Sequence, residues 1–256
     1  MLFKARPELT EIISIRSNYE GEFPYVHNDL RSICGMDIFK SDVYRGPNLG
    51  VYIRVNDSVA LVPMGYAKSK AEKLAKYLDV NILYTSIANT RLIGALSVMN
   101  NKGILLPKTA YQNEYDLLEK ETDLKVGVLE SKFTALGNVI CANDKGAVVS
   151  PWLSDSDCQT IKDVLGVEVI QKKIAGFNQT GVVLVANNTG AVIHPEADEK
   201  DMKVFSNLLG VTVEQSSINN GIPYVSSGIL ANNHGIVVGS LTSGSEIMML
   251  TRAFLN

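Results

Sequence analysis

Hydrophobic and polar positions follow one pattern that recurs five times along the chain. Each copy has an apolar segment, a polar turn that begins with Asn, and a second short apolar run. The turns begin at Asn56, Asn100, Asn143, Asn187 and Asn232, and their fourth residues are 44, 43, 44 and 45 positions apart. A period of this length indicates that one supersecondary unit is repeated in series.

Within a unit, the pattern predicts two strands, a helix and a further strand. Asn and Gly tolerate the positive φ angles of tight hairpins, so each turn should join two antiparallel strands. Proline cannot donate to a strand ladder, and it ends the second strand in four units, at Pro63, Pro107, Pro151 and Pro195. An amphipathic helix follows, and a last strand closes the unit, as at 167–174 and 211–218.

Equivalent positions of the five predicted helices are apolar and lie on one face, because their spacing is i, i+3 and i+7. The first position is occupied by Ala71, Tyr115, Cys158, Met202 and Ile247. The second is occupied by Leu74, Leu118, Ile161, Phe205 and Leu250. The third is occupied by Leu78, Thr122, Leu165, Leu209 and Phe254, with Thr122 as the polar exception. Ser154 and Asp157 resemble a capping box at one helix start.

The fifth unit has no closing strand, because the chain ends at Asn256 just after its helix. A strand-like segment at 37–43 precedes the first unit and has no partner there. We therefore predict that this N-terminal strand completes the last unit and closes a ring, which removes free sheet edges. A TIM barrel needs eight strand–helix units, and a WD40 blade has no helix. Five ββαβ units in a closed ring instead match the α/β architecture called the pentein, or α/β propeller.

Residues 1–35 stand outside the repeat. We expect them to form a poorly ordered leader before a single five-repeat domain at 36–256. Met36 precedes the closing strand and is a candidate for the natural start of the protein.

Composition narrows the class of protein. The chain has 256 residues, of which 46% are hydrophobic and 20% charged, as in ordinary globular proteins. A net charge of -3 argues against a protein that grips nucleic acid mainly through phosphates, although it leaves room for a local basic patch. Three dispersed cysteines form neither a disulfide framework nor a zinc motif, so we expect a reduced, cytoplasmic setting. The sequence contains no signal-peptide core and no apolar run long enough to span a membrane.

Pentein rings include guanidine-modifying enzymes, such as deiminases and amidinotransferases, and also non-catalytic proteins. The enzymes need a nucleophilic Cys beside a His, with carboxylates that hold a guanidinium. Here Cys158 and Cys141 fall at positions that are mostly apolar in the other units, and the fifth unit, where the enzymes carry their nucleophile, has no Cys. His234 falls at a turn apex and His194 at a strand-to-helix junction. The enzyme alternative is therefore disfavoured.

Metal and cofactor motifs are also missing from the sequence. It has no paired histidines at i, i+4, no CxxC and no glycine-rich phosphate loop, so we expect neither a metal nor a cofactor. One polar residue stands out instead. The position after the glycine that begins the first four units, with its counterpart in the fifth, is occupied by Val51, Ala95, Asn138, Val182 and Ser227. Asn138 is the largest polar member, and it is either an internally satisfied amide or a recognition contact.

Four stretches resemble translation initiation factor 6 of archaea and eukaryotes: NLGVY at 48–52, SKFTALGN at 131–138, DVLGVEV at 163–169 and IAG at 174–176. SKFTALGN is the most specific of them, and the likeness runs from about 36 to 256. The resemblance implies a non-catalytic, monomeric protein that binds the intersubunit face of the large ribosomal subunit near the sarcin–ricin region. It would block joining of the small subunit and assist late large-subunit maturation. Release is linked in that family to an elongation-factor-like GTPase and a Shwachman–Bodian–Diamond-type protein.

The resemblance also implies site residues. Asn138 matches the family motif on the ribosome-facing side, and Arg91 corresponds to a family arginine. Further candidates, chosen by position only, are Lys132, Thr134, Asn178, Asn219 and Asn220. Two departures are the leader and the NNG at 219–221, where NRG is common, and the second puts one basic contact in doubt. The long C-terminal tail of eukaryotic members is not seen, which favours an archaeal type.

Overall fold

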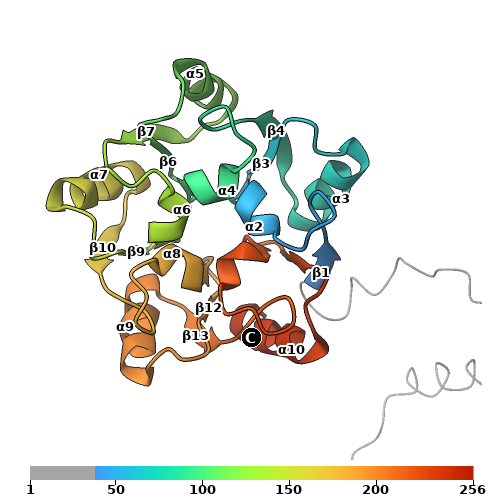
Figure 1. Ribbon diagram of the computed structural model, residues 1–256, viewed down its shortest axis with the longest axis vertical. Helices are drawn as coiled ribbons and strands as arrows, with labels where there is room; N and C mark the ends of the chain where they lie inside the picture. Colours follow the sequence, from blue (N-terminus) through green and yellow to red (C-terminus); the bar gives the residue numbers. More distant parts are fainter. Residues whose placement is uncertain (1–37, 256) are drawn as a thin grey trace, which may run out of the picture. The chain divides into compact units, whose positions relative to one another are not determined.

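The computed structural model describes residues 38–255, and these residues form five similar units around a central axis (Figure 1). Each unit contains one three-stranded sheet and one long helix on the outside of the sheet. The predicted α/β fold of five repeated units is therefore confirmed. The leader at 1–35, with Cys34, and the candidate start at Met36 lie outside the described residues.

Each sheet has an inner, a middle and an outer strand. The inner strands are β2 (Arg54–Val55), β5 (Val98–Met99), β8 (Ile140–Ala142), β11 (Leu184–Ala186) and β14 (Ile229–Ala231). The middle strands are β3 (Val59–Pro63), β6 (Gly103–Pro107), β9 (Gly146–Val149), β12 (Gly190–Ile193) and β15 (Ile236–Gly239). The outer strands are β4 (Asn81–Thr85), β7 (Lys125–Leu129), β10 (Glu168–Gln171), β13 (Thr212–Gln215) and β1 (Ile38–Ser41). Inner and middle strands are antiparallel, whereas middle and outer strands are parallel.

The outer strand of the fifth sheet comes from the other end of the domain. β1 pairs in parallel with β15, from Ile38 opposite Ile236 to Ser41 opposite Gly239. The prediction that the N-terminal strand completes the last unit is therefore confirmed. This pairing joins residues about 200 positions apart in sequence and covers an edge that would otherwise be free.

The five long helices are α3 (Lys68–Leu78), α5 (Gln112–Glu121), α7 (Asp155–Leu165), α9 (Glu199–Leu209) and α10 (Gly244–Phe254). Their predicted apolar face is confirmed, since Leu74, Leu118, Ile161, Phe205 and Leu250 are all buried. Thr122, the polar exception, follows the end of α5, and its hydroxyl donates to the Leu118 carbonyl. The capping box of Ser154 and Asp157 at α7 is also confirmed.

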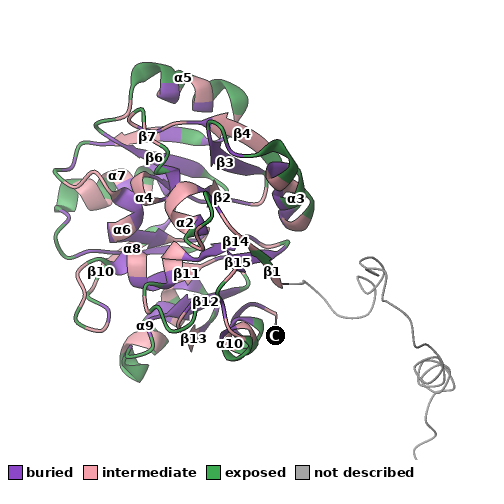
Figure 2. Ribbon diagram, turned by 45° about the vertical axis from the view of Figure 1, so that its right-hand side comes forward, coloured by how far each residue is buried: buried purple, intermediate pink, exposed green. Residues whose placement is uncertain are grey.

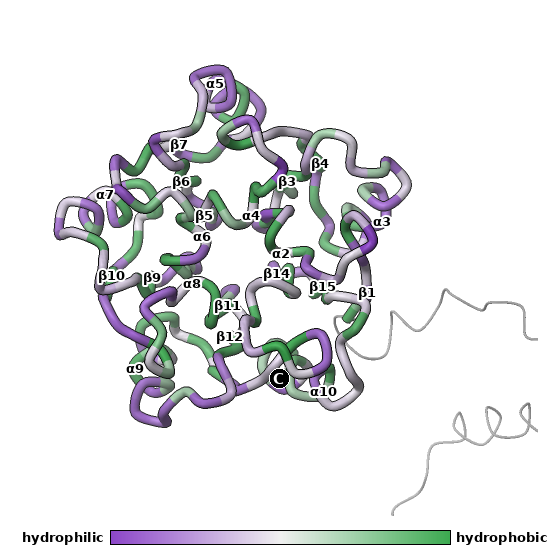
Figure 3. The backbone as a smooth tube through the Cα atoms, viewed as in Figure 1, coloured by the Kyte–Doolittle hydropathy of each residue, from purple (hydrophilic) through white to green (hydrophobic). Residues whose placement is uncertain are grey.

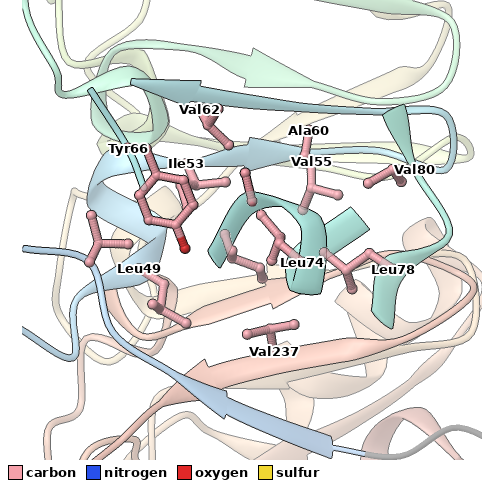
Figure 4. Packing of buried hydrophobic residues seen from close by; sticks show 13 residues of the cluster. Leu49, Ile53, Val55, Ala60, Val62, Tyr66, Leu74, Leu78, Val80 and Val237 are labelled. Atoms are coloured by element: carbon pink, nitrogen blue, oxygen red, sulfur yellow. The ribbon is translucent and has the colours of Figure 1, made fainter. Parts of the chain in front are cut away.

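Each long helix packs beside two sheets. In Figure 4, Leu74 and Leu78 of α3 lie between Val55 and Ala60 of their own unit and Val237 of β15. Buried residues concentrate in the strands, and the exposed, hydrophilic surfaces of the long helices face outward (Figures 2 and 3). Since the core is shared between neighbouring units, no unit buries its apolar surface alone.

The start of each unit differs from the predicted strand. It forms a single helical turn in α2 (Leu49–Tyr52), α4 (Ile93–Leu96), α6 (Leu136–Val139) and α8 (Thr180–Val183), and a 3₁₀ turn, η3 (Val225–Ser227), in the fifth unit. The prediction of a strand from the glycine onward was wrong. Glycine instead permits backbone contact between successive helices: a Cβ on Gly94 would clash with the Gly50 carbonyl, and one on Gly137 with the Gly94 carbonyl.

The Asn-rich turns form a hydrogen-bonded series at the other end of the inner strands. The side-chain oxygen of each first Asn accepts from the backbone N–H groups two and three residues later. Its amide group donates to the backbone carbonyl of the corresponding Asn in the next unit. The series runs from Asn56 to Asn100, Asn143, Asn187 and Asn232, and Asn232 donates back to Asn56.

Candidate functional site

Three cavities follow one another along the axis of residues 38–255. We call the largest the mouth pocket; it has a volume of about 530 Å³ and is lined by the short helices, among them Gly50, Gly94 and Gly137. The inner cavity, of about 60 Å³, is lined by all five inner strands. A third space of about 30 Å³ lies among the Asn-rich turns. The molecule therefore has two distinct ends, the short-helix face with the mouth pocket and the turn face.

Asn138 lies in α6 and lines the mouth pocket. Its backbone N–H donates to the Ala135 carbonyl, but its side-chain amide makes no hydrogen bond with any described residue. Val51, Ala95, Val182 and Ser227, at the equivalent positions, line the same pocket. Asn138 thus presents an amide without a hydrogen-bond partner among residues 38–255 in a pocket lined by both apolar and polar residues, which is the arrangement of a recognition contact.

Three of the predicted residues occupy equivalent places in successive units. Arg91, Thr134 and Asn178 each precede the glycine of their short helix by three positions, in the second, third and fourth units. Arg91 is exposed, and its guanidinium carbon lies 5.2 Å from the centroid of the Tyr44 ring. The short-helix face therefore carries polar groups at its rim in these three units.

Asn219 and Asn220 lie in the loop of the fifth unit and differ from each other. Asn219 is buried and lines the mouth pocket, and its side-chain amide donates to the Pro47 carbonyl at 3.2 Å. Its side-chain oxygen accepts from the Thr242 hydroxyl at 3.3 Å. Asn220 is exposed. Asn219 therefore holds the loop in place, whereas Asn220 presents its side chain to solvent.

The loops that carry Arg91 and Asn220 are each fixed by a buried glutamate that the sequence analysis did not identify. Glu246, in α10, accepts hydrogen bonds from the hydroxyl of Ser217 and from the backbone N–H groups of Asn220, Gly221 and Ser243. Burial by itself would raise its pKa, but these donated hydrogen bonds lower the pKa to about 2.

Glu114, in α5, has the same role in the second unit. It accepts from the hydroxyl of Ser86 and the N–H groups of Ala88, Asn89 and Tyr111. Burial again opposes the shift, and the donated hydrogen bonds again lower the pKa of this carboxyl. Each glutamate is the third residue of its helix, and this capping position was the available sequence signal.

Lys132 lies away from the mouth pocket. It lines a separate cavity of about 420 Å³ with Phe133 and Trp152, whose rings stack at 5.5 Å between centroids. The Lys132 ammonium lies 5.1 Å from the centroid of the Phe133 ring. The structure therefore does not bring Lys132 together with Asn138.

The fifth unit adds apolar side chains that the sequence analysis also missed. Ile222, Tyr224 and Leu241 line the mouth pocket and are 41%, 43% and 60% exposed. Large apolar side chains are rarely left this exposed next to one another in a cavity unless they bind something. Their position in loops, where polar residues are the norm, was the signal in the sequence.

The thiols and histidines of the described part lie outside the mouth pocket lining. Cys141 is buried in β8, and burial raises its pKa to about 12. Cys158 is half-buried rather than buried as predicted, because it sits at the rim of the helix face. His194 is buried, and its Nδ1 accepts from the Glu196 N–H at 3.1 Å, so it stabilises the turn at the strand-to-helix junction between β12 and α9. His234 is exposed, as predicted.

Residues 38–255 contain no cluster of three or more His, Cys, Asp or Glu residues placed to hold a metal ion. Within the same range, no helix has the length and apolar character needed to cross a membrane.

Comparisons with known proteins identify close relatives. The model of the eIF-6 family matches residues 38–253. The chain is 84% identical over 221 residues to translation initiation factor 6 of Nitrosopumilus maritimus, covering 86% of this chain and all of the relative. It is 62% identical to the factor of the same name from Cenarchaeum symbiosum and 44% identical to that from Pyrococcus furiosus, over 86% and 85% of this chain and 99% and 98% of the relatives.

Solved structures give a more distant likeness. A dimethylarginine dimethylaminohydrolase bound to S-methyl-L-thiocitrulline is 12% identical with a TM-score of 0.45, over 66% of this chain and 68% of that one. The N-terminal domain of ArgZ is 9% identical with a TM-score of 0.44, over 66% and 67% of the two chains. Their likeness concerns the fold and carries no information on activity.

Proposed function

This chain belongs to the eIF-6 family, and from that premise we propose that it is a non-catalytic translation initiation factor that binds the large ribosomal subunit. Bound there, it would prevent the small subunit from joining by occupying the surface that the small subunit needs. The mechanism is steric and requires no bond to be made or broken, so affinity has to come from shape, hydrogen bonds and a few anchoring side chains.

The observation that carries this proposal is the amide of Asn138 in the mouth pocket, which has no hydrogen-bond partner among residues 38–255. An amide that makes no hydrogen bond with residues 38–255 offers donors and an acceptor to a partner without rearrangement. Ile222, Tyr224 and Leu241 supply exposed apolar area beside it. An apolar centre with a polar rim is the usual composition of a protein–protein interface.

Charge favours ribosomal proteins over ribosomal RNA as the main contact. The chain has a net charge of -3, and of the residues proposed for the short-helix face only Arg91 is basic. RNA binding through phosphates would require several lysines or arginines together. We therefore propose contact with proteins near the sarcin–ricin region, where family members bind.

The family premise extends to biogenesis and release. We propose that the protein also assists late maturation of the large subunit in the cytoplasm, where it would act as a monomer. Release would depend on an elongation-factor-like GTPase acting with a Shwachman–Bodian–Diamond-type protein. These partners follow from the family premise alone.

A pentein enzyme that modifies guanidino groups is the disfavoured alternative. Such an enzyme needs a thiolate in an open pocket, with its pKa lowered by a neighbouring base. Cys141 is buried with its pKa raised to about 12, and Cys158 has a raised pKa because of partial burial and the nearby Asp155 and Asp157. Both shifts are opposite to what a nucleophile requires. Citrulline formation from arginine would overturn this conclusion.

The proposal can be tested with purified ribosomal subunits on sucrose gradients. At saturating protein, wild type should hold the large and small subunits apart and sediment with the large one. Asn138→Ala should require about tenfold more protein for the same effect, as expected for one interface hydrogen-bonding side chain. His234→Ala, which changes an exposed residue on the turn face, is the matched control and should behave like wild type.

Unchanged subunit joining in the presence of saturating wild-type protein would contradict the proposal. Normal folding without any subunit binding would instead indicate a scaffold for another partner.

A further inference from the structure

Inside the molecule, Arg54 is a charged residue at a position that is uncharged in the other four units. It begins β2, and the corresponding residues of the other inner strands are Val98, Cys141, Val185 and Leu230. All five line the inner cavity of about 60 Å³. Four walls of this cavity are thus apolar or a thiol, and the fifth carries a guanidinium.

The guanidinium has few partners. One terminal nitrogen donates to the Gly94 carbonyl, and Nε is buried without a hydrogen-bond partner among residues 38–255. The residues that line the inner cavity include no carboxylate. Asp57 and Asp144 line the separate space at the turns, where asparagine amides already donate to their carboxylates.

The charge of Arg54 persists under physiological conditions. Burial lowers the pKa of Arg54 to about 10, which still leaves it protonated at neutral pH. Cys141 does not neutralise it, because burial raises the pKa of that thiol to about 12 and keeps it uncharged. Arg54 is partly buried, and its Nε is enclosed without a hydrogen-bond partner among residues 38–255. A charge withdrawn from water in this way is costly unless it is paired. The cavity therefore lacks one negative charge.

We propose that the inner cavity binds a small monovalent inorganic anion, such as chloride, with Arg54 as its cationic ligand. A volume of about 60 Å³ accommodates a halide with an accompanying water molecule and is too small for a nucleotide. Gly50 and Ser226 line both the inner cavity and the mouth pocket, so the anion would enter from the short-helix face. The proposal is independent of ribosome binding, since it rests on the cavity and on Arg54 alone.

Anomalous diffraction from crystals grown in sodium bromide tests the site directly. We expect a bromide peak in the inner cavity within hydrogen-bonding distance of Arg54, and no such peak in crystals of Arg54→Met. A cavity that holds only water in the wild type, or a peak that persists in Arg54→Met, would overturn the proposal.

Thermal unfolding in solution gives a second readout. At constant ionic strength, replacing sodium gluconate, whose anion is too large for the cavity, by sodium chloride should raise the wild-type Tm along a single-site curve. The expected rise is about 3 °C at a tenfold excess over the dissociation constant. Arg54→Met should lose this rise, and Arg54→Gln serves the same purpose if Met fails to fold. Lys120→Met, which removes an exposed charge, should keep it. An equal rise in the Arg54 variants would contradict the assignment.

Discussion

The residues at the two ends of the inner strands differ in how closely they repeat from unit to unit. At the turn face, all five units have Asn at the first turn position, and all five side chains make the same contacts with their own turn and the next unit. At the short-helix face, the equivalent position of the five units is occupied by Val51, Ala95, Asn138, Val182 or Ser227. One end of the molecule is thus uniform, and the other differs from unit to unit.

This difference separates structural from functional residues. A contact that holds neighbouring units together has to recur wherever two units meet, so it appears five times. A surface that fits one asymmetric partner has no reason to repeat. Asn143 and Asn138 illustrate the contrast. The same amide side chain is buried and hydrogen-bonded at one end, and at the other it has no hydrogen-bond partner in the described part of the chain. Substitutions at the two ends should therefore have separable effects.

The largest expected effect is on the turn face. Asn143→Ala removes hydrogen bonds to Lys145, Gly146, Asn187 and Leu209 from a buried site. We expect a loss of about 3–4 kcal/mol in the free energy of unfolding, since each bond contributes about 1 kcal/mol. Urea unfolding followed by circular dichroism measures it. A change below about 1 kcal/mol would show that the asparagine series does not hold the units together.

The second largest effect is expected for Glu246→Gln. Glu246 stabilises the fold, as the turn asparagines do, but the loop that it fixes belongs to the short-helix face. Gln cannot accept from all the donors that surround Glu246, so we expect a loss of about 2–3 kcal/mol at pH 7. Lower affinity for large subunits should accompany it, because the loop that carries Asn220 is no longer fixed. Glu119→Gln, on the exposed side of α5, is the control and should change neither quantity.

The stability of wild type and that of Glu246→Gln should also depend differently on pH. The folded-state pKa of Glu246 is about 2, below the ordinary value of 4.5. Its stabilisation is therefore fully present above pH 4.5 and is lost as the pH falls from 4.5 towards 2. The stability difference between wild type and Glu246→Gln should shrink over that interval. A constant difference across it would contradict the assigned role of the carboxylate.

Gly137→Ala tests the backbone contacts between the short helices of the short-helix face. The added methyl group would collide with the Gly94 carbonyl and the Arg54 guanidinium, so α4 and α6 would have to separate. We expect a loss of about 2 kcal/mol, typical of overpacking. Gly244→Ala, at the start of α10 with open space around it, should be neutral or slightly stabilising. Equal changes in the free energy of unfolding for Gly137→Ala and Gly244→Ala would contradict the claim that close backbone packing requires glycine at position 137.

The smallest expected effect on stability is at Asn138. Asn138→Ala should change the free energy of unfolding by no more than about 0.5 kcal/mol, because the amide has no hydrogen bond with residues 38–255 to lose. Set beside Asn143→Ala, it gives the sharpest contrast between the two ends. A destabilisation as large as that of Asn143→Ala would mean that Asn138 has a structural role.

Much of the fold follows from the sequence because repetition averages out local ambiguity. Five copies of one helix face predicted the five long helices, and the missing last strand predicted the pairing of β1 with β15. The short helices were missed because four residues are too few to show a helical period. Their shape depends on backbone contact between glycines of neighbouring units, which no single segment contains.

The site was predictable only in part. Asn138 is an exception among equivalent residues, and Arg54 is a similar exception at the position that Cys141 occupies in the third unit. Lys132 is close to Asn138 in sequence, but the two residues line different cavities. Burial of Asn219 depends on Pro47, a contact between the two ends of the repeat region, and sequence spacing does not reveal such contacts.

The central claim is that the short-helix face, and not the turn face, contacts the large subunit. A photoreactive phenylalanine analogue introduced in place of either Tyr224 or His234 tests it directly, since both residues are exposed, one on each face. After irradiation with large subunits, we predict crosslinks to ribosomal proteins from the analogue at Tyr224 and none from the analogue at His234. Crosslinks from the His234 position alone would contradict the claim.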